Sequence, residues 1–369
     1  MSKCNAFLGG IMLDERGIMD VCCGSQWPGN MRKHFPIEQY EQMQQYRLRA
    51  WENSKTKWQI GCQSCQLSEQ IKDESSREKF NRIVDVAENP INTSIQQTTI
   101  RTGRTCNLKC TMCGPSLSSK WASFVDNNLN SEFIKKYKLS VDDEEVSQEK
   151  FVDFVKNKII NPDLKRIEFT GGEPLYSKAT YKIVEYLLET GYYKKIEKIK
   201  LQTNGTTKFN DVMKDLFKRF NGSVEVSLSS DGTDEVFEYI RRDHSWDNFV
   251  DVTTSMKQFL DTTGLEYSLK ISYMLQAINS KSFEKDREFY NNWDQLHDRE
   301  PFHYDIVHDP KHLSLASIPL NLKKLWKCPV DDSLKYNQLQ HKNMIEYYDV
   351  IDTKDNHPSW RNFIPELEL

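Results

Sequence analysis

Two different rhythms of apolar and polar positions divide the chain near residue 95. Beyond it, β-prone runs at 94–101, 166–170, 198–203, 224–228, 267–275 and 302–307 alternate with amphipathic stretches. These stretches have helical spacing near 148–159, 178–190, 209–220, 233–242, 246–261 and 282–296. Such alternation is typical of parallel β-α-β units, and six units are too few for a closed eight-fold barrel. We therefore predict an α/β fold built on a partial (β/α)6 TIM-like barrel.

The first 90 residues lack this alternation. An apolar stretch ending at Leu13 predicts a buried strand, and the Asp14–Gly17 turn predicts a hairpin to the next β-prone run. Residues 37–53 fit one helix, whereas 125–147, with the acidic run 142–145, fit a solvated insertion. We place domain boundaries so that 1–90 is a small cysteine-rich module, 91–319 the barrel and 320–369 a C-terminal extension.

Composition narrows the class of protein. Lys and Arg total 50 against 54 Asp and Glu, so the net charge is −4, which argues against binding to nucleic acid or anionic lipid through bulk charge. The 18 Phe, 16 Tyr and 8 Trp can fill a core. No apolar run approaches the roughly 20 residues that span a bilayer. The N-terminus lacks the basic region and cleavage site of a secretory signal, so we expect a cytoplasmic protein.

Nine cysteines carry the chemical information. They fall into two clusters and one isolated residue: Cys4, Cys22, Cys23, Cys62 and Cys65; Cys106, Cys110 and Cys113; and Cys328. A disulfide framework is disfavoured in a chain of this length without a secretion signal. Clusters at short spacing in a reducing compartment instead indicate metal or iron–sulfur ligands.

The second cluster has the spacing Cys106-x3-Cys110-x2-Cys113 and follows the first predicted barrel strand. Catalytic groups of such barrels lie at the carboxyl ends of the strands. Three thiolates on one loop can hold three irons of a [4Fe–4S] cluster, and the fourth iron is then open to a chelating α-amino-carboxylate. A zinc site and incidental cysteines are the alternatives, but structural zinc generally takes four protein ligands.

These residues resemble the radical SAM (S-adenosylmethionine) superfamily over roughly 95–310. Cys-x3-Cys-x2-Cys is the cluster motif of that family, and Thr170–Leu175 resembles its Gly-Gly-Glu segment. Thr203-Asn204-Gly205 and Ser227–Gly232 resemble further family segments at strand ends. Met112 stands where the family often has an aromatic residue beside adenine.

The resemblance implies which residues bind SAM. Gly171, Gly172 and Glu173 would bind its methionyl amine, since two glycines admit the ligand and a carboxylate takes an ammonium. The other implied contacts are Met112 at the adenine, Thr203 and Asn204 at the third strand, and Ser229 and Asp231 at the carboxylate and ribose. Gln276 and Asn279 are weaker candidates.

The N-terminal cysteines predict a second centre. Cys62-x2-Cys65 is a chelating turn, and the hairpin would bring Cys4 near Cys22. Four thiolates would coordinate a cluster fully. The pattern resembles the auxiliary-cluster twitch module, the shorter relative of the SPASM domain, although that module usually follows the barrel. Cys23 is an alternative to Cys22, which strand pairing favours, and a zinc ribbon is the alternative to a second [4Fe–4S] cluster.

Three further residues have two interpretations each. Cys328 is either an ordinary thiol, or a hydrogen-atom donor or spare ligand. His303 and His308 flank the end of the sixth strand and either line the pocket or are structural.

The predicted function is radical SAM chemistry, with two [4Fe–4S] clusters and SAM as cofactors. Reductive cleavage of SAM would give a 5′-deoxyadenosyl radical that takes a hydrogen atom from a peptide, a protein side chain or a small molecule. The auxiliary cluster would then accept an electron, relay electrons or anchor the substrate. Flavodoxin or ferredoxin is the expected electron donor, and no membrane partner is expected. The rivals are a non-catalytic metal-binding protein and an RNA-modifying enzyme, which the net charge disfavours.

Overall fold

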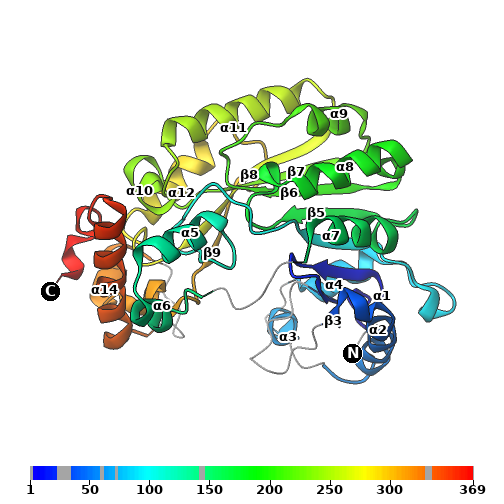
Figure 1. The fold of residues 1–369 in the computed structure, drawn as a ribbon, viewed down its shortest axis with the longest axis horizontal. Coiled ribbons are helices and arrows are strands. Elements are labelled where there is room, and N and C mark those ends of the chain that lie inside the picture. The colour runs from blue at the N-terminus through cyan, green and yellow to red at the C-terminus, as the bar shows by residue number, and fades with distance from the viewer. Residues whose placement is uncertain are drawn as a thin grey trace. The chain divides into compact units, whose positions relative to one another are not determined.

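A computed structural model describes residues 3–22, 35–58, 62–70, 74–140, 146–328 and 335–368. The fold over these residues is α/β, with a sheet that contains mostly parallel strands. Figure 1 shows the elements in chain order. Within the described residues, no helix is both long and apolar enough to cross a membrane.

The sheet has nine strands over the described part of the chain, in the order β3-β2-β1-β4-β5-β6-β7-β8-β9. β1 pairs in parallel with β4, β4 with β5, and β5 with β6, while β2 and β3 are antiparallel to their neighbours. The strand bounds are β1 Gly10–Leu13, β2 Ile18–Asp20, β3 Phe35–Pro36, β4 Gln97–Arg101, β5 Arg166–Thr170, β6 Lys198–Thr203, β7 Ser223–Ser229, β8 Glu266–Leu275 and β9 Phe302–Ile306.

The helices follow the strands as parallel β-α-β units require. Their bounds are α1 Ala6–Gly9, α2 Tyr40–Ser54, α3 Gln63–Gln70, α4 Ser76–Ile83, α5 Ser119–Asn128, α6 Ser131–Tyr137, α7 Gln148–Phe154, α8 Lys178–Thr190, α9 Asp211–Arg219, α10 Asp234–Ile240, α11 Trp246–Asp261, α12 Phe283–Asn292, α13 Leu320–Leu325 and α14 Gln338–Asp355. Val155–Ile159 continues α7 as a π-helix.

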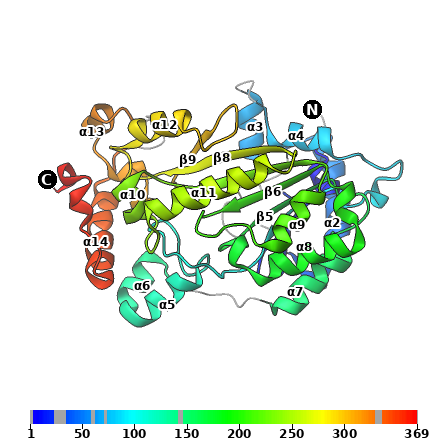
Figure 2. The ribbon, with the colours of Figure 1, turned by 90° about the horizontal axis from the view of Figure 1, so that it is seen from above.

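The chain divides into two compact units. Unit 1 comprises Met1–Gly103, Asp143–Leu201 and Asn210–Val224, and unit 2 comprises Arg104–Asp142, Gln202–Phe209 and Glu225–Leu369. In unit 1, α7, α8 and α9 lie along β5 and β6 (Figure 2). Ile167 and Phe169 of β5 are buried, as are Ile183 and Leu187 of α8, so the core of this unit is apolar.

The six predicted barrel strands are all present, and those at 166–170 and 198–203 have the predicted bounds. The helices at 178–190 and 246–261 also match. The hairpin at Asp14–Gly17 is confirmed, since β1 and β2 pair with Met12 opposite Asp20. Strand β1 then extends the same sheet through β4, which the sequence pattern did not predict. The predicted boundaries at 90 and 319 stay a prediction.

Two local predictions need correction. The N-terminal stretch is not one strand, because Ala6–Gly9 forms the helical turn α1 before β1 begins. Gly9 packs so closely that a Cβ there would lie 2.3 Å from Val84 Cγ1. The insertion predicted at 125–147 is instead helical over most of its described residues. Phe133 and Tyr137, four residues apart on one face of α6, are buried and stabilise that helix against the rest of the unit. The acidic run at 142–145 and the turn at 27–30 lie outside the described residues.

Burial of His244 contributes to the dependence of the stability of unit 2 on pH. His244 packs against Phe237 and Phe249, with ring centroids 5.2 and 6.1 Å away. Burial, with a smaller contribution from Arg241, lowers its pKa from 6.5 to about 4. The unfolded chain therefore takes up a proton between these values that the folded chain does not.

We expect the free energy of unfolding to fall as pH decreases from 6.5 to 4, with this histidine contributing ~1.4 kcal/mol per pH unit in the middle of that window. The variant His244→Gln should remove that share, as measured by urea unfolding at pH 7, 6 and 5. His303→Gln, at an exposed histidine, is the control. An unchanged pH dependence in His244→Gln would contradict the assignment.

Candidate functional site

The three central cysteines lie on a loop of unit 2, residues 104–117, which we call the cysteine loop. The start of α5 holds its backbone: Ser118 Oγ donates to Leu108 O over 2.5 Å, and Trp121 Nε1 donates to Cys110 O over 2.7 Å. Ser119 Oγ accepts from Cys106 N over 3.2 Å. These three bonds hold the loop in one conformation although it has no regular secondary structure, and they therefore help to fix where its side chains lie.

The thiols of this loop interact with one another. Cys110 donates a hydrogen bond to Cys113, which raises the pKa of Cys110 and lowers that of Cys113. Cys106 interacts electrostatically with Cys113, and Asn204 Nδ2 lies 3.8 Å from Cys106 Sγ. Asn204 also donates to Asn107 Oδ1 over 3.1 Å. The structure therefore brings the predicted triad together with Asn204 of the Thr203-Asn204-Gly205 turn.

A buried cation lies beside these thiols. Arg241 Nη1 is 3.8 Å from Cys110 Sγ, and Arg241 Nε is 2.7 Å from Asp231 Oδ2. The other carboxylate oxygen of Asp231 accepts from Met274 N over 2.7 Å. Burial raises the pKa of Asp231, against the opposing effect of Arg241. The guanidinium favours the thiolate form of its neighbours, because an adjacent opposite charge stabilises an ionised group.

The next residue ties the same region to the C-terminal helix. Arg242 is buried and donates to the Asp352 carboxylate of α14. Lys109 of the cysteine loop is 2.5 Å from Asp355 Oδ1 and 3.2 Å from Asp243 Oδ2. Tyr347 Oη donates to Thr111 O over 3.2 Å. Helix α14, within the predicted extension 320–369, is therefore bonded directly to the cysteine loop.

The remaining predicted SAM contacts of unit 2 have local partners. Thr203 is buried, and its hydroxyl accepts from Gly205 N over 3.3 Å. Ser229 Oγ accepts from Gln202 Nε2 over 2.7 Å. Met112 is half-buried and lines a cavity together with Cys113. The weaker candidates Gln276 and Asn279 are buried, and Asn279 Oδ1 accepts from Gln276 N over 2.8 Å.

The Gly-Gly-Glu turn belongs to unit 1 and lies against the end of β4. Gly171 has φ +133°, and a Cβ there would lie 3.0 Å from Gly103 O and Thr102 N. Gly172 N donates to Gly103 O over 2.8 Å. Glu173 is buried, and its Oε1 accepts from Leu175 N over 2.9 Å. Glycine at 171 is thus required by both backbone conformation and close approach.

The N-terminal cysteines also belong to unit 1, and three of them interact. Burial raises the pKa of Cys4 to about 12, and electrostatic repulsion from Cys62 and Cys65 makes a smaller contribution in the same direction. Its backbone N–H donates to Ser54 Oγ over 2.9 Å. Cys22 is half-buried and lies two residues beyond Asp20 on the predicted hairpin. Cys23 lies outside the described residues, so the choice between it and Cys22 stays open.

Neither set forms a ready-made metal site in the described ranges, where no three His, Cys, Asp or Glu side chains have that arrangement. The chemistry of the cysteine loop still fits an iron–sulfur cluster. It offers three thiols on one anchored loop, two of them hydrogen-bonded, with a fixed guanidinium beside them. Three thiols leave one position of a four-iron cluster without a protein ligand.

Sequence reasoning missed the groups that hold the loop. Arg241, Arg242, Trp121 and Ser118 carry no metal-ligand signature, and an Arg-Arg pair at a helix end normally indicates a solvated surface. The one available signal for Ser118 was its position as a helix N-cap before α5. Cys328, for which two interpretations were open, is buried, and its Sγ lies 3.3 Å from Ser280 O.

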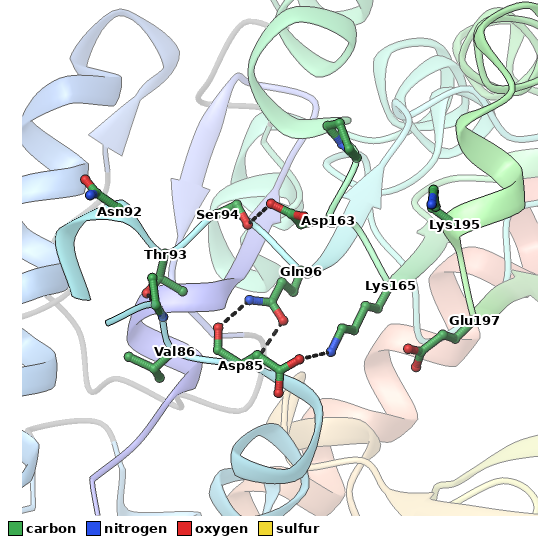
Figure 3. A pocket seen from close by; sticks show the side chains of 12 residues that line it. Asp85, Val86, Asn92, Thr93, Ser94, Gln96, Asp163, Lys165, Lys195 and Glu197 are labelled. Carbon is green, nitrogen blue, oxygen red and sulfur yellow. Dashed lines mark hydrogen bonds and ion pairs between the residues drawn. The ribbon is translucent and has the colours of Figure 1, made fainter. Parts of the chain in front are cut away.

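A second cavity, of about 380 Å³, lies in unit 1 (Figure 3). Its lining includes the residues that directly precede β4, β5 and β6, namely Gln96, Lys165 and Glu197. Lys165 Nζ is 2.5 Å from Asp85 Oδ2, and Gln96 Nε2 donates to Asp85 O. This is the amino end of the strands, whereas catalytic groups in such folds lie at the carboxyl end. We do not assign the chemistry to it.

Comparison with known proteins supports a radical SAM assignment for the central region. Residues 100–270, just under half of the chain, match the model of the Radical SAM superfamily. The match shows that these residues are similar to that superfamily, as the motifs also indicate. It does not extend to the N-terminal cysteines. No curated protein sequence matches the chain.

Two solved structures illustrate the matches found among known structures. One is native anSMEcpe with bound AdoMet, at 18% identity and a TM-score of 0.41, over 72% of this chain and 63% of that chain. The other is SuiB of Streptococcus suis bound to the precursor peptide SuiA, at 10% identity and a TM-score of 0.36, over 97% of this chain and 73% of that chain. The chain therefore spans less than two thirds of the length of anSMEcpe.

The Arg241–Asp231 pair gives a prediction about stability. Arg241→Met leaves a buried carboxylate without its cation and should cost about 3–5 kcal/mol of unfolding free energy. The double variant Arg241→Met with Asp231→Asn removes both charges and should recover a large part of that loss. Urea unfolding of the two variants and the parent measures both values. Equal destabilisation in the single and double variants would contradict a paired buried charge.

Proposed function

We propose that the chain is a radical SAM enzyme whose cysteine loop holds a [4Fe–4S] cluster through Cys106, Cys110 and Cys113. The observation that carries this is the loop itself: three mutually interacting thiols beside a buried guanidinium, inside a radical SAM domain. A cluster bound by these three cysteines would supply the electron for reductive cleavage of SAM, and the resulting 5′-deoxyadenosyl radical would take a hydrogen atom from the substrate.

The residues around the cysteine loop would stabilise the charge of a bound cluster and hold the loop in position. Arg241, held by Asp231, keeps a positive charge next to the Cys110 sulfur, which stabilises the thiolate and the negative charge of a reduced centre. The amide N–H of Asn204 points toward the Cys106 sulfur. Hydrogen bonds to cluster sulfurs are among the factors that set the reduction potential of a cluster. Helix α14, through Lys109 and Tyr347, keeps the loop in place.

We propose that SAM contacts Met112 through its adenine, Gly171, Gly172 and Glu173 through its methionyl amine, and Thr203, Asn204 and Ser229 through its remaining polar groups. Asp231 has both carboxylate oxygens engaged by the protein, so its contribution is to position Arg241 and the β7 end.

The N-terminal set would hold an auxiliary [4Fe–4S] cluster through Cys4, Cys22, Cys62 and Cys65. The mutual interaction of Cys4 with Cys62 and Cys65 supports it. A four-thiolate zinc site uses the same donors and is the alternative. An auxiliary cluster would accept an electron from the substrate radical and make the net reaction an oxidation or a bond formation. The rival class, a metal-binding protein without catalysis, would bind iron but leave SAM intact.

The first test removes the triad. We expect the parent, reconstituted anaerobically with iron and sulfide, to hold about eight irons per chain, and the Cys106→Ala, Cys110→Ala, Cys113→Ala variant about four, with no SAM cleavage on reduction. Cys328→Ala, outside both sets, is the control and should keep both properties. Iron analysis, electron paramagnetic resonance and chromatography of 5′-deoxyadenosine measure the outcome. Parent-like cleavage in the triple variant would overturn the proposal.

The second test separates the two sets. The variant Cys62→Ala, Cys65→Ala should lose about four irons yet still cleave SAM, because the cysteine loop is intact. Metal analysis by plasma mass spectrometry distinguishes iron from zinc in the parent. If the parent holds one zinc per chain and this variant holds none, the N-terminal cysteines form a zinc site and not an auxiliary cluster. Loss of SAM cleavage in this variant would show that the two sets are not independent.

A further inference from the structure

A cation-rich cavity of about 410 Å³ lies beside the cysteine loop in unit 2. Met112 and Cys113 form one wall, the C-terminal end of α6 forms another, and residues 309–312 and α14 complete it. Its volume falls in the usual range of small-molecule sites, and proteins of this fold place substrate near the carboxyl ends of the strands. It is lined by three lysines, although the whole chain has a net charge of −4.

The charges of the cavity leave one positive charge uncompensated. Lys136 Nζ is 2.5 Å from Glu346 Oε2 and is therefore balanced. Lys138 and Lys311 are exposed and form no ion pair within the described part of the chain, and the same holds for Asp309. Two lysines against one aspartate leave a net charge of +1. That balance suits a single carboxylate, whereas a phosphate dianion would overcompensate it.

A buried polar side chain in the wall also lacks a partner. His312 is 7% exposed, lies between Tyr137 and Tyr347, and lines the cavity. No atom of the described residues forms a hydrogen bond with its Nε2. Burial, followed by Lys136, lowers its pKa to about 4, so the ring is neutral at pH 7. A buried imidazole nitrogen without a partner is costly unless a ligand or water satisfies it.

We propose that this cavity binds a carboxylate group of the substrate, with Lys138 and Lys311 as its cationic contacts and His312 in its wall. The proposal rests on the proposed function, because it places a carboxylate-bearing substrate beside the loop that would hold the cluster. It assigns a substrate class, namely small molecules or peptide side chains that carry a carboxylate. SAM also carries a carboxylate, so the experiment must separate the two sources.

The test uses the full chain without iron and the reactivity of Cys113, which lines the cavity. Neutral iodoacetamide alkylates this thiol, and peptide mass spectrometry measures the rate. We expect glutarate to slow the alkylation at least about threefold at saturation and the uncharged glutaramide to have no effect, because only glutarate is attracted by the lysines. Lys138→Met, Lys311→Met should abolish the protection. Lys135→Met, an exposed lysine of α6 that does not line the cavity, should retain it.

Several outcomes would overturn the proposal: no protection by glutarate, equal protection by glutaramide, or full protection in the double lysine variant. Stronger protection by inorganic pyrophosphate than by glutarate would reject the carboxylate class. Weaker SAM binding to the iron-loaded double variant in equilibrium dialysis would assign the cavity to SAM instead. Failure of the proposed function is seen separately, because iron content and SAM cleavage of the parent do not depend on this measurement.

Discussion

Two adjacent buried arginines that pair in different directions hold the candidate site of unit 2 together. Arg241 pairs with Asp231 and lies against the Cys110 sulfur, while Arg242 pairs with Asp352 of α14. A guanidinium is always charged and cannot be buried without partners. The positions of the β7 end and the C-terminal helix are therefore fixed by the same short segment that approaches the cysteine loop. The loop, which has no regular structure, depends on these neighbours for its conformation.

The sequence predicted the periodic elements well and the contacts between distant segments poorly. Strands β5 and β6 and helices α8 and α11 alternate apolar and polar positions strongly enough to define their bounds. The pairing of β1 with β4 was not predictable, since β1 is four residues long and its partner lies more than eighty residues later. The prediction for residues 125–140 was wrong because polar residues outnumber apolar ones in this segment, although Phe133 and Tyr137 are buried.

In the candidate site too, the sequence predicted the local motifs but not the long-range contacts. The cysteine spacing and the Gly-Gly-Glu turn were visible because short local motifs carry them, and Gly171 does have the conformation that requires glycine. The groups that position the thiols were not visible, because Arg241, Trp121 and Lys109 act through contacts across the chain. Asp231, predicted from its motif as a ligand contact, has its oxygens occupied by Arg241 and Met274 N. A motif thus identifies the region, whereas the fold decides what each member does.

The parallel pairing of β1 with β4 has a consequence for biosynthesis. β1 is made before its parallel neighbour Gln97–Arg101, which emerges more than eighty residues later. Until then the hairpin of β1 and β2 exposes a strand edge and apolar side chains such as Ile11, which is buried in the finished fold. The segment that carries Cys4 therefore completes its structure only after β4 has left the ribosome. Metal delivered earlier would meet thiols that the sheet has not yet organised.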